Sequence, residues 1–302
     1  MAENPLIRVG TAGGPAAMAK IWRGAGYVVI AILSLIAIAA TVLWLLSWEK
    51  LNRRIEGRPE HLVRPTAAQL ADAPRQLRVL ACIECHGEGL RGNIVIDNPS
   101  LARLYAPNLT LVAASATDQQ LARAIRQGIA VDGRPLALMP SSQYARLGDG
   151  QVAALIAAIR ALPRGGEPTP PIRLGPAGTI GVALGKFPTA HQLVEEDSRH
   201  LPIDLGPQYE RGRDLVMVNC AECHGPALEG TELEPGLHAP DLAIAAAYDL
   251  PQFTRFMRTG IAAGNRNLPV MSRRARDAFS HYTDEEIASI HAYLVARAAH
   301  QR

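Results

Sequence analysis

Two short stretches with the same pattern determine the architecture of this chain, Cys82-Ile-Glu-Cys85-His86 and Cys220-Ala-Glu-Cys223-His224. Together they contain all 4 cysteines of the 302-residue sequence. In a helix, two thiols at this spacing lie about one turn apart, so both can react with one edge of the same planar molecule. The histidine that follows each pair adds an imidazole beside that molecule. The sequence therefore predicts two equivalent sites, each with two thiols and one nitrogen ligand.

The pattern C-x-x-C-H is the attachment sequence of c-type haem. The two thiols add to the porphyrin vinyl groups, and the adjoining imidazole binds the iron. We therefore predict two covalently bound haem c groups as cofactors. The predicted thioether residues are Cys82, Cys85, Cys220 and Cys223. The predicted histidine ligands of the iron are His86 and His224.

Three other uses of paired cysteines are less compatible with the sequence. The two pairs are far apart for a structural zinc site, and each carries the extra histidine. A thioredoxin-like redox motif would belong to a βαβ pattern, which this chain lacks. A disulfide between two thiols so close in a helix would be strained. Haem attachment is therefore favoured over zinc, thioredoxin chemistry and disulfides.

An internal repeat selects two methionines as the sixth iron ligands. Methionine is a common partner of histidine in cytochromes, because its soft thioether favours Fe(II). Residues 121–139 align with residues 253–271, and in each stretch a glycine, Gly128 or Gly260, precedes the methionine at the same distance. The predicted ligands are therefore Met139 and Met271.

The remaining candidates for the sixth ligand have weaker support. Met217 and Met257 do not recur in the other copy, so we predict that they are core residues. In the second half His238 is the main alternative ligand, and His281 is a weaker one. A loop histidine is more often a solvated or hydrogen-bonded surface residue.

The order of these features resembles class I cytochrome c domains. More narrowly, the stretch from Asp132-Gly-Arg-Pro to Met139-Pro-Ser-Ser-Gln-Tyr144 is similar to the haem-binding region of the cytochrome subunits of membrane-bound alcohol and gluconate dehydrogenases. The likeness covers residues 75–162 well and residues 207–299 more loosely. It implies that His86 and Met139 ligate one iron and His224 and Met271 the other. Those subunits commonly carry three haems, and the second copy here lacks the proline after its methionine.

Residues 24–48 predict a transmembrane anchor. They contain no charged side chain, and at 1.5 Å per residue they span roughly 35 Å, enough to cross a hydrocarbon core. Tryptophans flank the stretch at Trp22, Trp44 and Trp48, as in an aromatic belt. The bulky end of the stretch is unlike a signal-peptide cleavage site, so we expect the anchor to be retained.

Two indicators disagree about the orientation of this anchor. Basic residues are more numerous after the stretch than before it, which would place the C-terminal part in the cytoplasm. Covalent haem attachment in bacteria takes place outside the cytoplasmic membrane, as the cytochrome c resemblance implies. We give the haem motifs more weight than the charge bias. The predicted location is the bacterial inner (cytoplasmic) membrane, crossed once, with the C-terminal haem domains in the periplasm.

The predicted fold class is mainly α, with one N-terminal transmembrane helix followed by two tandem class I cytochrome c domains. The predicted segments are a cytoplasmic N-terminal segment 1–23, the anchor 24–48, a stalk 49–74, cytochrome c domain 1 at 75–163, a linker 164–206 and cytochrome c domain 2 at 207–302. We expect helices at 152–162, 208–218 and 287–298, and a short one before the first motif. The linker either clamps the two domains or only tethers them.

Composition and motifs limit the function. The net charge of +3 argues against nucleic-acid binding, and the sequence has no phosphate loop, flavin or nicotinamide fingerprint. We therefore expect an electron-transfer protein rather than an enzyme, with the membrane and redox partner proteins as its partners. The preferred role is that of a subunit that accepts electrons from a dehydrogenase and passes them to the respiratory chain. The alternatives are a dihaem subunit of a haem-copper oxidase and a dihaem peroxidase.

A basic cluster near Met271 has two interpretations. It consists of Arg266, Arg273, Arg274 and Arg276. The simpler interpretation is a solvated loop. The functional one is a patch that attracts an acidic partner to an exposed haem edge.

Overall fold

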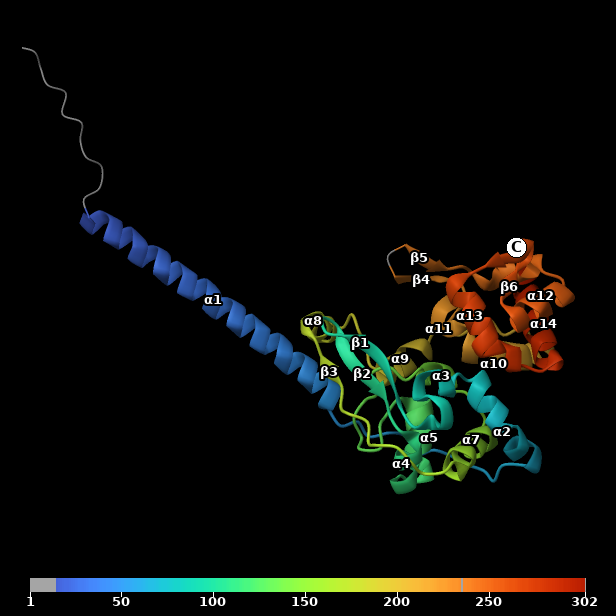
Figure 1. Ribbon diagram of the computed structural model, residues 1–302. Helices are drawn as coiled ribbons and strands as arrows, with labels where there is room; N and C mark the ends of the chain where they lie inside the picture. The colour runs from blue at the N-terminus through green and yellow to red at the C-terminus, as the bar shows by residue number, and fades with distance from the viewer. Residues whose placement is uncertain (1–14, 235, 302) are drawn as a thin grey trace, which may run out of the picture.

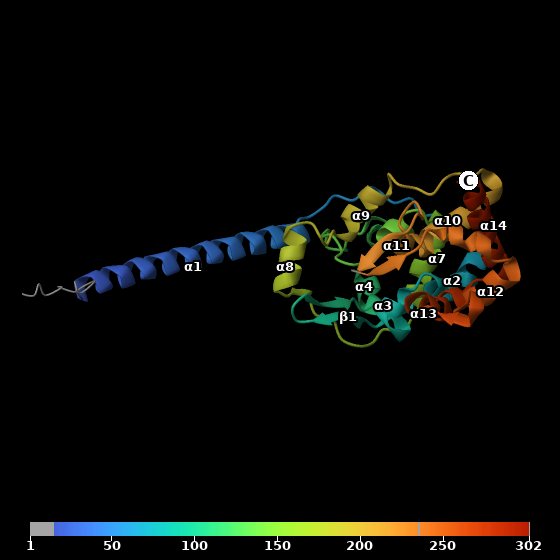
Figure 2. The same cartoon turned by 90° about the horizontal axis from the view of Figure 1, so that it is seen from above.

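The computed structural model describes residues 15–234 and 236–301, and most of its elements are helices. A long helix, α1 (Pro15–Asn52), projects away from a globular part formed by the rest of the chain (Figures 1 and 2). It contains the predicted anchor and extends beyond it at both ends. Within its most apolar 18-residue window no side chain is buried, as lipid contact would require. Residues 1–14 of the predicted N-terminal segment lie outside the described residues.

The first globular unit follows α1 after an extended stretch, residues 53–66. Its elements are α2 (Ala67–Val79), α3 (Cys82–His86), the 3₁₀ helix η1 (Glu88–Leu90), β1 (Asn93–Asn98), β2 (Ala102–Ala106), α4 (Leu109–Ser115), α5 (Asp118–Gln127), α6 (Ser141–Tyr144) and α7 (Asp149–Ala161). The first and last of the main helices, α2 and α7, pack against each other.

The second unit repeats this order of elements. It contains η2 (Pro207–Tyr209), α10 (Glu210–Asn219), α11 (Ala221–His224), β4 (Thr231–Glu234), β5 (Leu237–Ala239), η3 (Leu242–Ala247), α12 (Leu250–Thr259), β6 (Ile261–Ala262), η4 (Ala263–Asn265), β7 (Arg266–Asn267), α13 (Pro269–Asp277), η5 (Phe279–His281) and α14 (Asp284–His300). Helices α10 and α14 pack as α2 and α7 do. The repeat inferred from sequence is therefore a structural repeat as well.

The predicted helices are present with shifted ends. Helices α7 and α14 begin three residues before the predicted starts, at Asp149 and Asp284, and α10 begins at Glu210. Acidic residues are favourable in the first turn, because the helix dipole leaves partial positive charge there. The basic cluster near Met271, predicted as a solvated loop, lies largely on helix α13.

The equivalent helices α5 and α12 show why the repeated glycines are needed. Each begins with a capping box, in which a polar side chain and a glutamine satisfy the free N–H groups. Each ends at a glycine in the left-handed region, Gly128 (φ 66°) and Gly260 (φ 72°). A Cβ at Gly128 would lie 2.6 Å from the backbone nitrogen of His191, and one at Gly260 would lie 2.4 Å from the Ser272 carbonyl oxygen. Only glycine fits either position.

Each unit has its own apolar core, and the two cores meet between α2 and α10. Met217 and Met257 are buried in the second core, which confirms their predicted structural role. Val79 at the end of α2 also belongs to that second core, whereas Val218 of α10 belongs to the first. The two units therefore pack directly against each other.

The predicted linker is mostly folded. Its helices pack on the first half of the molecule, whereas Ile203 and Leu205 near its end contact the second unit. It contains β3 (Arg173–Leu174), α8 (Pro176–Ala183) and α9 (Ala190–Asp197). Strand β3 adds to the antiparallel β1–β2 pair, which carries a bulge between Ile94 and Ile96. Helix α8 packs against α1, and α9 packs against α5 and α6. The two further sheets, β4–β5 and β6–β7, are antiparallel pairs within the second unit.

Candidate metal centres

Each C-x-x-C-H stretch forms a short helix, α3 in the first unit and α11 in the second. Burial raises the pKa of the Cys82 thiol to about 12 and that of the Cys220 thiol to about 12. Burial also raises the pKa values of Cys85 and Cys223. The thiols are therefore neutral where they lie in the fold.

The two motif histidines are oriented in the same way. His86 is buried, and its Nδ1 lies 2.9 Å from the Pro107 carbonyl oxygen. His224 is also buried, and its Nδ1 lies 2.7 Å from the Pro240 carbonyl oxygen. A carbonyl can only accept, so each Nδ1 carries the proton and each Nε2 keeps its lone pair. Burial lowers the pKa of both imidazoles, which keeps them neutral and able to bind a metal.

The residue that follows Pro107 or Pro240 holds the proline carbonyl in place. Asn108 caps α4 by accepting from the Thr110 N–H, and it donates to the Gly165 carbonyl at 2.8 Å. Asp241 caps η3 in the same way and forms a 2.7 Å ion pair with Arg297 of α14. These contacts hold the carbonyls that orient the two histidines, the outer-shell role that metal-binding histidines generally require.

The repeat around each histidine is longer than the five residues that the sequence analysis used. Both motifs continue as G-x-x-L-x-G, and the last glycine donates its N–H to the histidine carbonyl at 2.8 Å in both units. Leu90 (φ 55°) and Leu228 (φ 64°) are almost fully buried despite left-handed backbones. Such backbones are uncommon for leucine and persist only where the surroundings enforce them. The shared extension Gly-x-x-Leu-x-Gly was the sequence signal for these residues.

The two predicted methionine ligands lie in equivalent places with different backbones. Met139 is in an irregular segment before α6, and Met271 is in the first turn of α13. Both are half-buried and pack against the core of their own unit. The first motif cysteine of the same unit, Cys82 or Cys220, contributes to that core as well. The fold therefore brings the methionine and thiol segments of each unit together, and iron ligation by the methionines stays a prediction.

Serines fasten both methionine segments to the preceding helix. Ser141 donates its hydroxyl to the Ala124 carbonyl of α5 at 2.9 Å, and Ser272 donates to the Gly260 carbonyl at the end of α12. Both serines are fully buried. They could not be predicted from sequence, because a serine near a methionine carries no signal by itself.

A buried tyrosine connects the methionine side of each unit to the thiol side. Tyr144 donates to the Leu80 carbonyl, two residues before Cys82. The Tyr282 hydroxyl accepts from the side-chain amide of Asn219, the residue before Cys220. Burial raises the pKa of both hydroxyls, so they remain neutral. The tyrosines lie at different distances from the methionines in sequence, which is why the repeat did not reveal them.

The histidines considered as alternative ligands lie elsewhere. His238 on β5 is 68% exposed, and its Nε2 is 3.9 Å from the Glu232 carboxylate. His281 lies in η5, and its carbonyl accepts a 2.8 Å hydrogen bond from Arg75 of the first unit. Neither position suggests a metal ligand in the core of the second unit.

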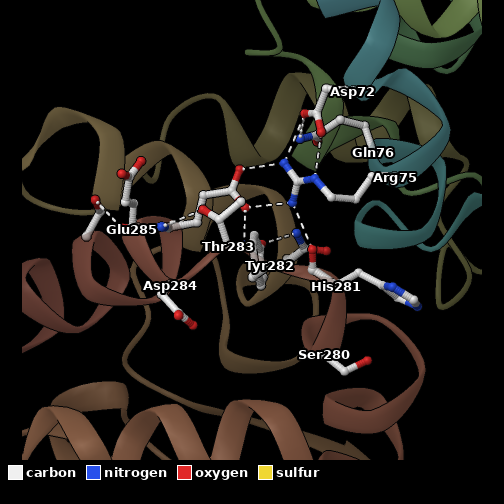
Figure 3. A network of polar contacts seen from close by, with 12 residues as sticks. Asp72, Arg75, Gln76, Ser280, His281, Tyr282, Thr283, Asp284 and Glu285 are labelled. Carbon is white, nitrogen blue, oxygen red and sulfur yellow. Dashed lines mark hydrogen bonds and ion pairs between the residues drawn. The ribbon is translucent and has the colours of Figure 1, made fainter. Parts of the chain in front are cut away.

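An ion-pair network joins the two units. Figure 3 shows Arg75 reaching from α2 toward the start of α14, with Asp72 and Gln76 beside it. Arg75 forms a 2.8 Å ion pair with Glu286, which is almost fully buried and also accepts from the Thr283 N–H. Burial alone would raise the pKa of Glu286, but the hydrogen bonds from Arg75 and Thr283 outweigh it and lower that pKa.

A second ion pair connects the two candidate sites themselves. Arg274, three residues after Met271, binds Glu84 at 2.7 Å, and Glu84 lies inside the first C-x-x-C-H motif. The Arg274 guanidinium also lies 5.8 Å from the centre of the Phe279 ring. One member of the predicted basic cluster is therefore part of the contact between the units.

Comparisons with known proteins agree with this geometry. Residues 209–297 match the cytochrome c family. Proteins named cytochrome bc1 complex cytochrome c subunit, from Mycobacterium tuberculosis (strain ATCC 25618 / H37Rv) and Mycobacterium bovis (strain ATCC BAA-935 / AF2122/97), are each 29% identical over 213 residues. The alignment covers 69% of this chain and 59% of either relative. The protein of that name from Mycobacterium leprae (strain TN) is 29% identical over 204 residues, 66% of this chain and 54% of the relative.

The chain thus contains a cytochrome c domain and is homologous to cytochrome c subunits, although it spans less than two thirds of their length. A cytochrome c domain implies covalently bound haem c. The relatives are named as cytochrome c subunits of a respiratory complex, which agrees with the prediction of an electron-transfer protein. The narrower resemblance to dehydrogenase subunits stays a prediction.

Proposed function

We propose that this chain is a membrane-anchored dihaem cytochrome c that relays electrons at the periplasmic face. The observation that carries the proposal is the duplicated donor set. Each unit combines two neutral thiols, a buried histidine whose Nε2 is free, and a methionine packed near the same core. Nitrogen and thioether donors of this kind match the needs of a haem iron. The proposed cytochrome c domains are 75–163 and 207–302, although α2 begins before the first of these, at Ala67 within the predicted stalk.

The residues of the chain have defined roles around such a group. Haem c, when bound, supplies one-electron oxidation and reduction. The cysteines would hold the porphyrin edge, and the carbonyls of Pro107 and Pro240 fix the tautomer of each histidine. The tyrosines tie the methionine segment to the thiol segment in each unit. Such outer contacts orient ligands and tune a metal site, so they would hold the histidine and methionine of each unit in place for the iron.

The contact between the units supports a relay through both centres. The Arg75–Glu286 and Arg274–Glu84 ion pairs and the shared cores hold the units against each other. Arg274 lies near one methionine ligand and binds the opposite motif. A fixed separation between two centres favours electron passage from one to the other within the chain.

The respiratory partner is the finer part of the proposal. The bc1 homologues favour a subunit of a complex of that kind, with α1 as the proposed anchor. The periplasmic placement of the two units rests on the haem-attachment motifs. The second candidate is the cytochrome subunit of a dehydrogenase, which the stretch 132–144 favours by its resemblance. Purification from native membranes in mild detergent distinguishes them. Stoichiometric recovery of bc1-type subunits supports the first, whereas a substrate dehydrogenase or a haem-copper oxidase core contradicts it.

Haem content and ligation are tested on the purified chain. We expect two haems per chain from the reduced pyridine adduct and from the intact mass, and a value of one would contradict the dihaem assignment. Reduced Met139→Ala and Met271→Ala should each bind carbon monoxide at one haem, because each opens one iron. Met257→Leu is the matched control, since this buried methionine has no counterpart in the first copy, and it should not bind carbon monoxide. Rapid binding by the unmodified protein would instead favour a peroxidase.

A further inference from the structure

Helix α8 of the linker and the turn that follows it carry a row of exposed apolar side chains. Ile180 in α8, Leu184 at its C-cap and Phe187 in the following turn are 45%, 62% and 47% exposed. Ile180 and Leu184 are four residues apart and so share one helical face, and the Phe187 ring folds back onto α8 at Gly181. Scattered exposed apolar residues are common, but such a row marks a contact surface. Gly178 is buried where α8 approaches the Leu101 carbonyl.

Helix α8 is rigidly attached at both ends. Its first turn is bonded to the β1–β2 connection, because the Ala177 N–H donates to the Ser100 carbonyl at 2.9 Å. Its last carbonyls, those of Val182 and Ala183, accept from Lys50 of α1 at 3.1 and 2.9 Å. A cation at this end also complements the helix dipole. The row of apolar side chains therefore has a fixed position relative to α1.

The position along α1 at which α8 packs indicates what the exposed apolar side chains of α8 contact. On α1, Leu43, Ser47 and Lys50 are less exposed than the residues around them, and they share one helical face. These positions lie at the end of the apolar stretch 24–48, where the exposed Trp44 and Trp48 flank the same level. Figure 2 shows α8 crossing the end of α1 instead of continuing along it, and Figure 1 shows the two side by side.

We propose that α8 lies in the surface of the bilayer and inserts Ile180, Leu184 and Phe187 among the lipids. The proposal rests on the membrane anchor proposed above. Continuity with the apolar surface of α1 favours lipid as the occupant, and so do the exposed basic side chains nearby, Lys186, Arg53 and Arg54, which suit anionic headgroups. The first unit would then touch the membrane at two points, so its orientation would be fixed rather than free to swing about α1.

Spin labelling of the full holoprotein in lipid nanodiscs tests this contact. A new cysteine is the only thiol free to react when the native ones are joined to haem, so we would label Ile180→Cys and Leu184→Cys. Leu46→Cys reports on the anchor, and Glu196→Cys on α9 is an exposed polar control. Power saturation with oxygen and with a water-soluble nickel chelate measures depth. We expect Ile180→Cys and Leu184→Cys to favour oxygen several-fold over the Glu196→Cys control.

The outcomes separate this inference from the anchor. If Leu46→Cys is lipid-exposed but both α8 positions resemble the Glu196→Cys control, the α8 contact is overturned and the anchor stands. If Leu46→Cys is also water-exposed, the proposed anchor fails, and the α8 contact fails with it. If α8 is protected in native membranes but water-exposed in nanodiscs holding the chain alone, a partner protein rather than lipid covers the row, which overturns the proposal.

Discussion

The two units share the contacts that orient the histidine of each C-x-x-C-H motif, but they differ in what covers them. In the first unit Arg126 of α5 is 10% exposed and is paired with Glu60 of the extended stretch at 2.8 Å. The equivalent Arg258 of α12 is 31% exposed and pairs with Asp284, itself 85% exposed, at 2.7 Å. The stretch 53–66 and the linker helices protect the first unit only. The two copies therefore keep similar contacts around their motif histidines but differ in the segments that cover them.

Removal of the thioether residues should have the largest effect and should differ between the units. We expect C82S/C85S and C220S/C223S each to lose one haem, because neither unit keeps both attachment points. A domain of about 90 residues has little core of its own, so loss of the porphyrin should loosen it. The second unit, which lacks the covering segments, should become the more sensitive to limited proteolysis. Equal cleavage rates for the two variants would contradict a protective role for residues 53–66 and the linker.

The contribution of residues 53–66 to the stability of the first unit can be tested by breaking the buried ion pair between Glu60 and Arg126. Glu60→Ala leaves the Arg126 guanidinium buried with one partner fewer, and we expect a loss of about 3 kcal/mol in the local free energy of opening. Asp284→Ala removes the exposed partner of Arg258, and we expect about 1 kcal/mol or less. Hydrogen exchange of peptides from α5 and α12 measures both. A Glu60→Ala effect no larger than that of Asp284→Ala would show that the stretch adds no stability.

Sequence alone could identify those features of the candidate sites that depend on short spacing. The C-x-x-C-H motifs, the Pro107 and Pro240 segments and the glycines after α5 and α12 could be found because each needs a particular residue at a fixed distance. The structural repeat could be found for the same reason.

Other features could not be predicted, because they depend on contacts between distant segments. Tyr144 and Tyr282 both bond to the segment just before the motif cysteines, although they lie at different sequence distances from Met139 and Met271. The attachment of α8 to Lys50 joins residues 132 and 133 positions apart. The pairing of Arg274 with Glu84 spans 190 positions. No periodicity or local pattern encodes such contacts.

The contact between the units should depend on pH through Glu286. Its pKa is lowered from 4.5 in the folded protein, so the ionised carboxylate stabilises the contact above about pH 4.5 and this stabilisation is lost as the pH falls through the lowered pKa. Glu286→Gln keeps the capping pattern at Thr283 but removes the ion pair with Arg75, which we expect to cost about 2 kcal/mol. Hydrogen exchange at α2 and the start of α14 measures the contact.

The matched control for this prediction is Glu84→Gln, which removes the more exposed ion pair of the same contact. It should retain the acid-induced opening, because Glu286 still titrates. Glu286→Gln should be partly open at neutral pH and should show a smaller further change on acidification. An unchanged acid transition in Glu286→Gln would assign the pH dependence to another group.

The smallest effects should come from the two buried tyrosines, and they test the symmetry of the sites most closely. Tyr144→Phe and Tyr282→Phe each remove one hydroxyl and no packing, so each should cost about 1 kcal/mol. Each tyrosine ties a methionine segment to a thiol segment, so its loss should also weaken the charge-transfer absorption of the ferric iron–methionine bond in its own unit. Equal losses of this absorption in the two variants would mean that the tyrosine hydrogen bond has the same effect in both units, despite the different sequence positions of the tyrosines. A loss in one unit only would mean that the other methionine segment is held by its serine and helix contacts alone.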